Sequence, residues 1–131
     1  IMKPLLYFMV LFVHFFPLGT NQGDIIDSLS ANFKTGNSKE IASHFSSSID
    51  LIIIDEEDVY SKAQAEQILK SFFTKYVPVK SSVIHRLNTN PNYRYGALSL
   101  VTKADTLRVS ITMKKHGNAF LITELRIETE K

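Results

Sequence analysis

The 131-residue chain contains no cysteine, and this absence excludes several classes of chemistry. Disulfide bonds, thiol catalysis, cysteine-ligated metals and a lipid-modified N-terminal cysteine all require that residue. Glycine is scarce, with five residues, and no glycine-rich loop of the kind that cradles a phosphate group occurs. The formal net charge is only +2 and no dense basic tract is present, so the sequence lacks the basic stripe typical of nucleic-acid-binding proteins.

Patterns that bind metals are missing as well. The four histidines, His14, His44, His85 and His116, share no metal-ligand spacing. The acidic run 55–58 has neither the alternate carboxylates nor the glycine turn of a calcium loop, so it is predicted to be a solvated turn. We therefore expect no metal site and no cofactor.

The N-terminal segment predicts export. Lys3 precedes an apolar run, 4–18, that only His14 interrupts, and small and polar residues follow at 19–23. This layout is typical of a secretory signal peptide, here assigned to residues 1–22. A transmembrane anchor is the alternative, but it needs about 20 apolar residues. We expect a periplasmic or extracellular protein with no stable membrane anchor after processing.

Residues 23–131 are predicted to form one α+β domain. Asp24 and Asn37 are expected to cap two helices, and Ser61 with Gln64 forms a capping-box pattern at the start of a third. The third helix carries an apolar stripe at helical spacing from Ala65 to Tyr76, which indicates a face packed on a sheet. Strands are expected at 49–54 and 79–87, and three antiparallel strands between 92 and 128.

The register of the last three strands can be predicted from side-chain parity, because a slip of one residue would turn every side chain to the other face. A three-residue loop at 116–118 pairs Met113 with Leu121, and a four-residue loop at 103–106 pairs Leu98 with Ile111. The predicted inner face is then Leu98, Leu100, Thr102, Leu107, Val109, Ile111, Met113, Leu121, Thr123, Leu125 and Ile127. The predicted outer face is Tyr95, Ala97, Ser99, Val101, Arg108, Ser110, Thr112, Lys114, Phe120, Ile122, Glu124 and Arg126.

The order of these elements resembles the nuclear-transport-factor-2-like cone of the cystatin-like superfamily, in which a curved antiparallel sheet wraps around N-terminal helices. Five segments also resemble a family of small exported bacterial proteins catalogued as domain of unknown function 4783. They are VYSKAQA (59–65), FF (72–73), YGAL (95–98), LRV (107–109) and ITELRI (122–127). The resemblance covers residues 24–128. It implies the fold and an exported location but no activity, because that family has none assigned.

The sequence favours a non-catalytic binding or protein-interaction domain. One hypothesis is that the cone holds an apolar ligand or a partner segment. Another is a protein contact through the outer sheet face, most simply in a homodimer. The alternative is a cone-fold enzyme, isomerase-like or dehydratase-like, with His85 as base. That requires Val83, His85 and Leu87 to point inward, whereas the opposite parity would place Ile84 inward and leave His85 exposed.

The candidate contact residues come from the predicted outer face. The predicted register aligns Tyr95, Lys114 and Phe120 in one row across the strands. It also places Arg108 opposite Arg126, with Glu124 near both. Apolar side chains on an uncovered face usually mark a partner. The candidate set is Tyr95, Arg108, Phe120, Ile122, Glu124 and Arg126.

Overall fold

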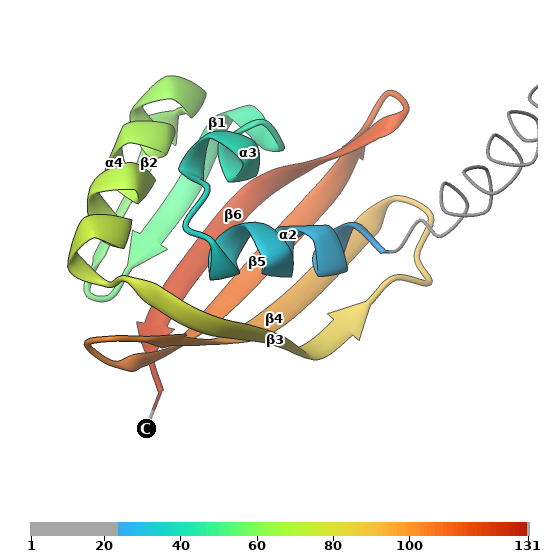
Figure 1. Cartoon of the computed structure of the whole chain (residues 1–131). Helices are drawn as coiled ribbons and strands as arrows, with labels where there is room; N and C mark the ends of the chain where they lie inside the picture. Colours follow the sequence, from blue (N-terminus) through green and yellow to red (C-terminus); the bar gives the residue numbers. More distant parts are fainter. Residues whose placement is uncertain (1–23, 131) are drawn as a thin grey trace, which may run out of the picture.

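A computed structural model describes residues 24–130 (Figure 1). The predicted signal peptide, residues 1–22, lies outside this range. Within the range, none of the helices has both the length and the apolar character needed to cross a membrane. The elements in chain order are α2 (Ile25–Lys34), α3 (Ser38–Ala42), β1 (Phe45–Ile53), β2 (Glu56–Ser61), α4 (Lys62–Lys75), β3 (Pro78–Leu87), β4 (Tyr93–Thr102), β5 (Thr106–His116) and β6 (Ala119–Thr129).

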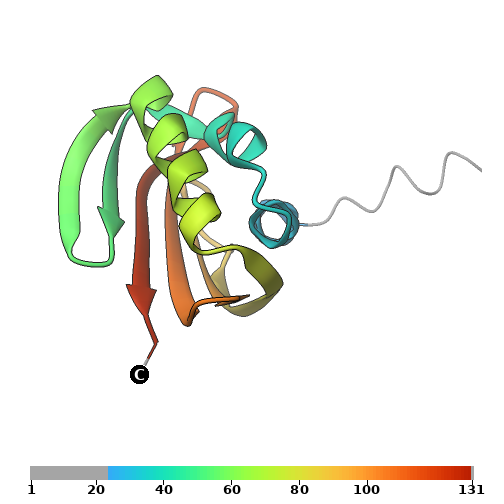
Figure 2. The same cartoon turned by 60° about the vertical axis from the view of Figure 1, so that its left-hand side comes forward.

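The strands form one six-stranded sheet in the order β2-β1-β6-β5-β4-β3. Neighbouring strands are antiparallel except β1 and β6, which are parallel. The sheet bends around the helices, which share one face of it (Figures 1 and 2). Helix α2 contacts β3 and β4, α4 contacts β1 and β2, and α3 lies between the two helices. The predicted α+β architecture, a curved sheet wrapped around helices, is confirmed.

The predicted helix caps are confirmed. The Asp24 carboxylate accepts a hydrogen bond from the Ile26 amide, and the Asn37 side chain accepts one from the Glu40 amide. At the start of α4, the Gln64 amide donates to Ser61 Oγ (3.2 Å) and the Ser61 amide donates to Gln64 Oε1 (3.1 Å). Each bond satisfies an amide that the first helical turn leaves without a partner, which is why these short polar residues start the helices.

Arg86 ties α2 to β3 on the helix-covered face. Its guanidinium lies 3.0 Å from Asp24 Oδ2 and 2.9 Å from Asp27 Oδ1. Asn88 also donates to Asp24 Oδ2 at 2.9 Å. Both acids lie at the helix N-terminus, where negative charge is also favoured by the helix dipole.

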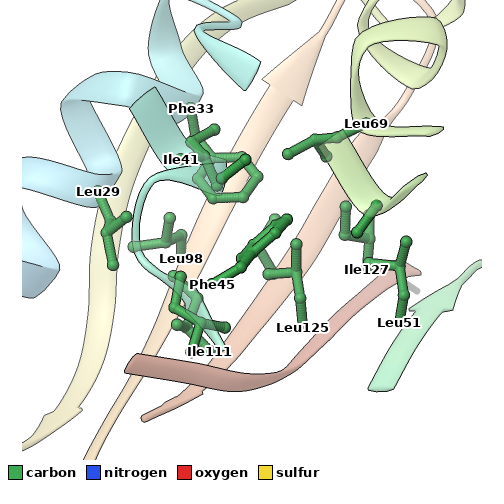
Figure 3. Close-up of a cluster of buried hydrophobic side chains, with 14 of the residues drawn as sticks. Leu29, Phe33, Ile41, Phe45, Leu51, Leu69, Leu98, Ile111, Leu125 and Ile127 are labelled. Atoms are coloured by element: carbon green, nitrogen blue, oxygen red, sulfur yellow. The ribbon is translucent and has the colours of Figure 1, made fainter. Parts of the chain in front are cut away.

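The space between the helices and the sheet is filled by apolar side chains (Figure 3). Phe33 and Ile41 from α2 and α3 meet Leu69 from α4 and Phe45 from β1, above the sheet residues. Each of the ten labelled side chains is at most 2% exposed. Full burial of one such side chain contributes about 1.5–3 kcal/mol. The labelled residues are Leu29, Phe33, Ile41, Phe45, Leu51, Leu69, Leu98, Ile111, Leu125 and Ile127.

The predicted three-residue loop between β5 and β6 is wrong. His116 pairs with Ala119, so the turn is the two residues Gly117 and Asn118, and Gly117 has a φ of 65°. A β-bulge follows, because Thr112 pairs with Glu124 but Met113 pairs with Ile122, which leaves Thr123 between them. The extra residue restores the parity that a two-residue turn alone would break.

This bulge changes which β6 residues face the core. Ile122 is fully buried, whereas Leu121 and Thr123, both predicted to face inward, are only half-buried. Beyond the bulge the prediction holds, and Leu125 and Ile127 are buried.

The predicted pairing of β4 with β5 is displaced by two residues. Leu98 pairs with Val109 and Leu100 with Leu107, not with Ile111 and Val109. The turn is tightened by Thr102, whose amide donates to the Asp105 carbonyl at 2.9 Å. Because two residues is an even shift, every side chain keeps its predicted face. The predicted inner residues of β4 and β5 are therefore buried.

The first two strands also differ from prediction. Strand β1 begins at Phe45, four residues before the predicted strand 49–54, and Phe45 pairs with Ile122. The acidic run contributes the turn residue Asp55 and the start of β2, a strand that was not predicted. The four acidic side chains, 55–58, are exposed, as expected. Ile54 precedes Asp55 in the turn with a φ of 59°, a region that β-branched residues rarely occupy.

Candidate contact surface on the outer face of the sheet

The face of the sheet opposite the helices is uncovered within residues 24–130 (Figure 2). We call it the outer face. Its side chains follow from the strand register, since alternate residues of a strand point to opposite faces. The first row across β3, β4, β5, β6, β1 and β2 is Leu87, Tyr95, Thr112, Glu124, Asp50 and Val59. The second row, in the same strand order, is His85, Ala97, Ser110, Arg126, Ile52 and Glu57. A third row, across β3 to β6, is Ser82, Ser99, Arg108 and Glu128.

Four of the six predicted contact residues lie on the outer face: Tyr95, Arg108, Glu124 and Arg126. Ile122 does not, because it is buried in the core. Phe120 also lies on the helix-covered side, where it packs against the core and its ring lies 4.2 Å from the Arg94 guanidinium carbon. Both errors have one cause, the bulge at Thr123, which reverses the faces of the residues before it.

The predicted rows are wrong as well. Tyr95 lies opposite Thr112 instead of Lys114, and Arg108 lies opposite Glu128 instead of Arg126. The predicted opposition of two arginines therefore does not occur. The two-residue shift of β4 on β5 explains the first error, and the altered β5–β6 register explains the second.

Arg126 is surrounded by acids. Its Nε lies 3.8 Å from Glu124 Oε2, and its Nη1 lies 3.5 Å from Glu128 Oε2. Glu124 was predicted to lie near Arg126. Ion pairs this exposed contribute at most about 1 kcal/mol each. Arg108, which is half-buried, forms no ion pair with any carboxylate of residues 24–130.

Asp50 is a site residue that the sequence analysis missed. It lies directly beside Glu124 in the parallel pairing of β1 with β6. Its Oδ1 atom is buried and has no hydrogen-bond partner among the described residues. Leaving such an oxygen without a partner costs about 1–3 kcal/mol. The available signal was a single acid inside the apolar run 49–54.

Apolar side chains of β1, β2 and β3 on the outer face were also missed. Ile52 is almost fully buried there, at 4% exposed, and lies in the same row as Ala97, which was predicted on this face and is 0% exposed. Val59 and Leu87, at the two ends of the first row, are 63% and 42% exposed. A face that only contacts water would be expected to alternate fully to polar residues.

Two hollows open beside the turn between β1 and β2. One, of about 480 Å³, lies between this turn and α4, where the rings of Phe72 and Tyr76 stack with centroids 4.8 Å apart. The other, of about 460 Å³, lies at the edge of the outer face beside Arg108 and Glu128. Ile54 lines both.

His85 does not reach the interior. A bulge in β3 between Val83 and His85 places Val83 against the core and His85 opposite Ala97, exposed on the outer face. The ring of His85 packs edge-on against Tyr95 at 5.9 Å. Among residues 24–130, the buried set contains no ionisable side chain. The requirement of the enzyme hypothesis, an interior base, is therefore not met by His85.

The described residues also contain no group of three or more His, Asp or Glu side chains arranged to hold a metal ion.

Comparison with known proteins identifies relatives by sequence and by structure. A family model described as "Domain of unknown function (DUF4783)" matches residues 26–128. No curated protein matches the chain. The crystal structure of a family protein from Bacteroides uniformis ATCC 8492 is 24% identical, covers 82% of this chain and 99% of its own, and has a TM-score of 0.78. Another from Bacteroides ovatus ATCC 8483 is 24% identical, with 79% and 93% covered and a TM-score of 0.74.

More distant structures define the wider fold. A domain of unknown function with a cystatin-like fold from Nostoc punctiforme PCC 73102 is 13% identical, with 78% of this chain and 70% of that chain covered and a TM-score of 0.63. Neighbours of this kind, together with nuclear-transport-factor-2-like structures, place the chain in the cone fold predicted from its sequence.

Proposed function

The match over residues 26–128 makes this chain a member of the DUF4783 family, and from its geometry we propose that it is a non-catalytic protein-interaction domain. The contact surface is the outer face of the sheet. The domain acts after export, as the pattern of Lys3 and the apolar run 4–18 predicts.

One observation carries the proposal: the outer face is uncovered, yet it contains apolar and unpaired polar groups that are unusual on a surface exposed only to water. It combines exposed Val59 and Leu87 with a half-buried arginine, Arg108, that has no ion pair in residues 24–130. It also contains Asp50 with its unpartnered oxygen. A complementary surface that covers the apolar groups and pairs the charges would lower the free energy of the complex.

A second candidate function is the binding of an apolar ligand in the hollow beside α4. The stacked rings of Phe72 and Tyr76, with Ile53 and Ile68, line this hollow, and its volume is in the range of small-molecule sites. The interior beyond it is filled by the buried side chains of the core, so a ligand would lie at the mouth of the cone.

Single cysteines distinguish the two candidates, because the chain has none of its own. Ser110→Cys reports on the centre of the outer face, Ser71→Cys on the hollow and Thr89→Cys on an exposed loop as the control. Each is labelled with a maleimide on the cells that produce the protein. For each variant, the labelling rate on cells is divided by the labelling rate of the purified protein in dilute solution. This ratio corrects for differences in the intrinsic exposure of the three cysteines.

The proposal predicts that Ser110→Cys is labelled at least about tenfold more slowly in cells than in dilute solution, as for a surface inside a protein interface. Thr89→Cys should show equal rates in both conditions. Protection of Ser71→Cys alone would favour the apolar ligand. Equal rates at Ser110→Cys would overturn the proposal.

A further inference from the structure

The charges of the outer face are divided between two halves of the sheet. Strands β2, β1 and β6 carry four acids there, and strands β5, β4 and β3 carry cations and no acid. The acids are Glu57, Asp50, Glu124 and Glu128, and the cations are Arg108, Lys114 and Lys80. Arg126 is the one cation in the acidic half, and it is held by two of the acids. The face therefore presents one negative half and one positive half.

We infer that the partner of this face is a second copy of the chain, related by a two-fold axis that runs along the strands between β5 and β6. This inference rests on the proposed function. Such an axis exchanges the halves of the sheet, so that the acidic half of each copy covers the basic half of the other. A two-fold axis across the strands would place acid on acid, which costs free energy. The charge division thus selects the axis.

Because the axis is parallel to the strands, each row across the sheet meets the same row of the partner. In the third row, Arg108 on β5 faces the partner's Glu128 on β6, and the symmetry repeats the pair. Arg108 thereby gains an ion pair, which it does not form with any carboxylate of residues 24–130 of its own chain, although Glu128 lies opposite it on β6. Strands β5 and β6 are at the centre of the sheet, so these two pairs lie close to the axis (Figure 1).

The other rows are complementary in the same way. In the first row, the Tyr95 hydroxyl faces the partner's Asp50, and Leu87 faces the partner's Val59. In the second row, Ala97 faces the partner's Ile52. Packed sheets cross at about −30°, so the rows are closest beside the axis and separate toward β2 and β3. Arg108 and Glu128 therefore provide the sharpest test.

The test is an exchange of charge between two copies, measured by sedimentation of the mature protein recovered from the cells that export it. Arg108→Glu alone sets two acids against each other across the axis, and Glu128→Arg alone sets two arginines against each other. Each variant should dimerise at least about tenfold more weakly than wild type. An equimolar mixture of the two should form a heterodimer about as tightly as wild type dimerises, because both crossing pairs are then Glu with Arg. Lys39→Glu, on the helix side, is the charge-matched control and should leave dimerisation unchanged.

Mixing is decisive because only a contact between copies can be rescued by it. Single variants that dimerise like wild type, or a mixture that stays monomeric while wild type is dimeric, would overturn this axis. A wild type that is monomeric at about 100 µM would overturn self-association, since association this weak would correspond to less than about 6 kcal/mol. In both cases the proposed function would still stand if Ser110→Cys is protected in cells, and would fail if it is not.

Discussion

Arg86 of β3 and Asp27 of α2 form a bidentate ion pair. Arg86 Nη1 lies 3.0 Å from Asp27 Oδ2, and Arg86 Nη2 lies 2.9 Å from Asp27 Oδ1. The hydrogen bonds from Arg86 lower the pKa of Asp27. At Asp24, burial raises the pKa, but bonds from the Ile26 amide, Asn88 and Arg86 prevail and the pKa is lowered. One guanidinium thus fixes the first turn of α2 to the sheet.

This pair predicts sensitivity to acid. Both carboxylates have a lower pKa in the folded state than in the unfolded state. Their contribution to stability is therefore present above about pH 4 and is lost as the pH falls through the lowered folded pKa. We expect the urea concentration at the unfolding midpoint of the wild type to decrease when the pH is lowered below about 4. The decrease should be smaller in Arg86→Met. Lys39→Met is the control, and an equal fall in the two variants would contradict the assignment.

The bulge at Thr123 predicts opposite outcomes for two neighbouring residues. Ile122→Ser should lower the free energy of unfolding by about 3 kcal/mol, because it removes a fully buried side chain and buries a hydroxyl. Leu121→Ser should cost no more than about 1 kcal/mol. Urea unfolding of the two variants provides the measurement. The reverse order would indicate that β6 pairs with β5 through a three-residue loop.

The turn between β1 and β2 predicts that one isoleucine can be replaced by glycine at little cost. Ile54 has a φ of 59°, and the strain of that conformation is about 1–3 kcal/mol. In Ile54→Gly the relief of strain offsets the lost packing of a half-buried side chain, so stability should change by less than about 1 kcal/mol. Ile53→Gly, in the adjoining strand, should cost about 2–4 kcal/mol. Equal costs in thermal unfolding would show that Ile54 is not strained.

Export is predicted from the sequence alone. N-terminal sequencing of the protein made in its own host should begin between Thr20 and Asp24. Leu11→Asp, in the apolar run, should prevent processing, because a signal peptide needs an uninterrupted apolar region. A mature protein that still begins at Met2 would show that residues 1–22 are not a signal peptide.

Local features of the fold were predictable because their causes are local. The caps at Asp24, Asn37 and Ser61 depend on short polar side chains next to free amides. The buried face of α4 follows from apolar residues at helical spacing, with Leu69 and Phe72 buried as predicted. The faces of β4 and β5 follow from strict alternation, which survives even the two-residue error in their pairing.

The tertiary structure alone decided the features that depend on distant segments. The Ile122 amide donates to the His44 carbonyl at 2.7 Å, and Phe45 pairs with Ile122, so the bulge at Thr123 is fixed by a strand far away in the chain. No local pattern near Thr123 encodes that contact, and parity reasoning within one hairpin therefore selected the wrong loop. The same parallel pairing of β1 with β6 brings Asp50 beside Glu124 and divides the charges of the outer face. The sequence by itself determined which residues form helices and most of the core, and the non-local pairing of strands determined which side chains meet on the surface.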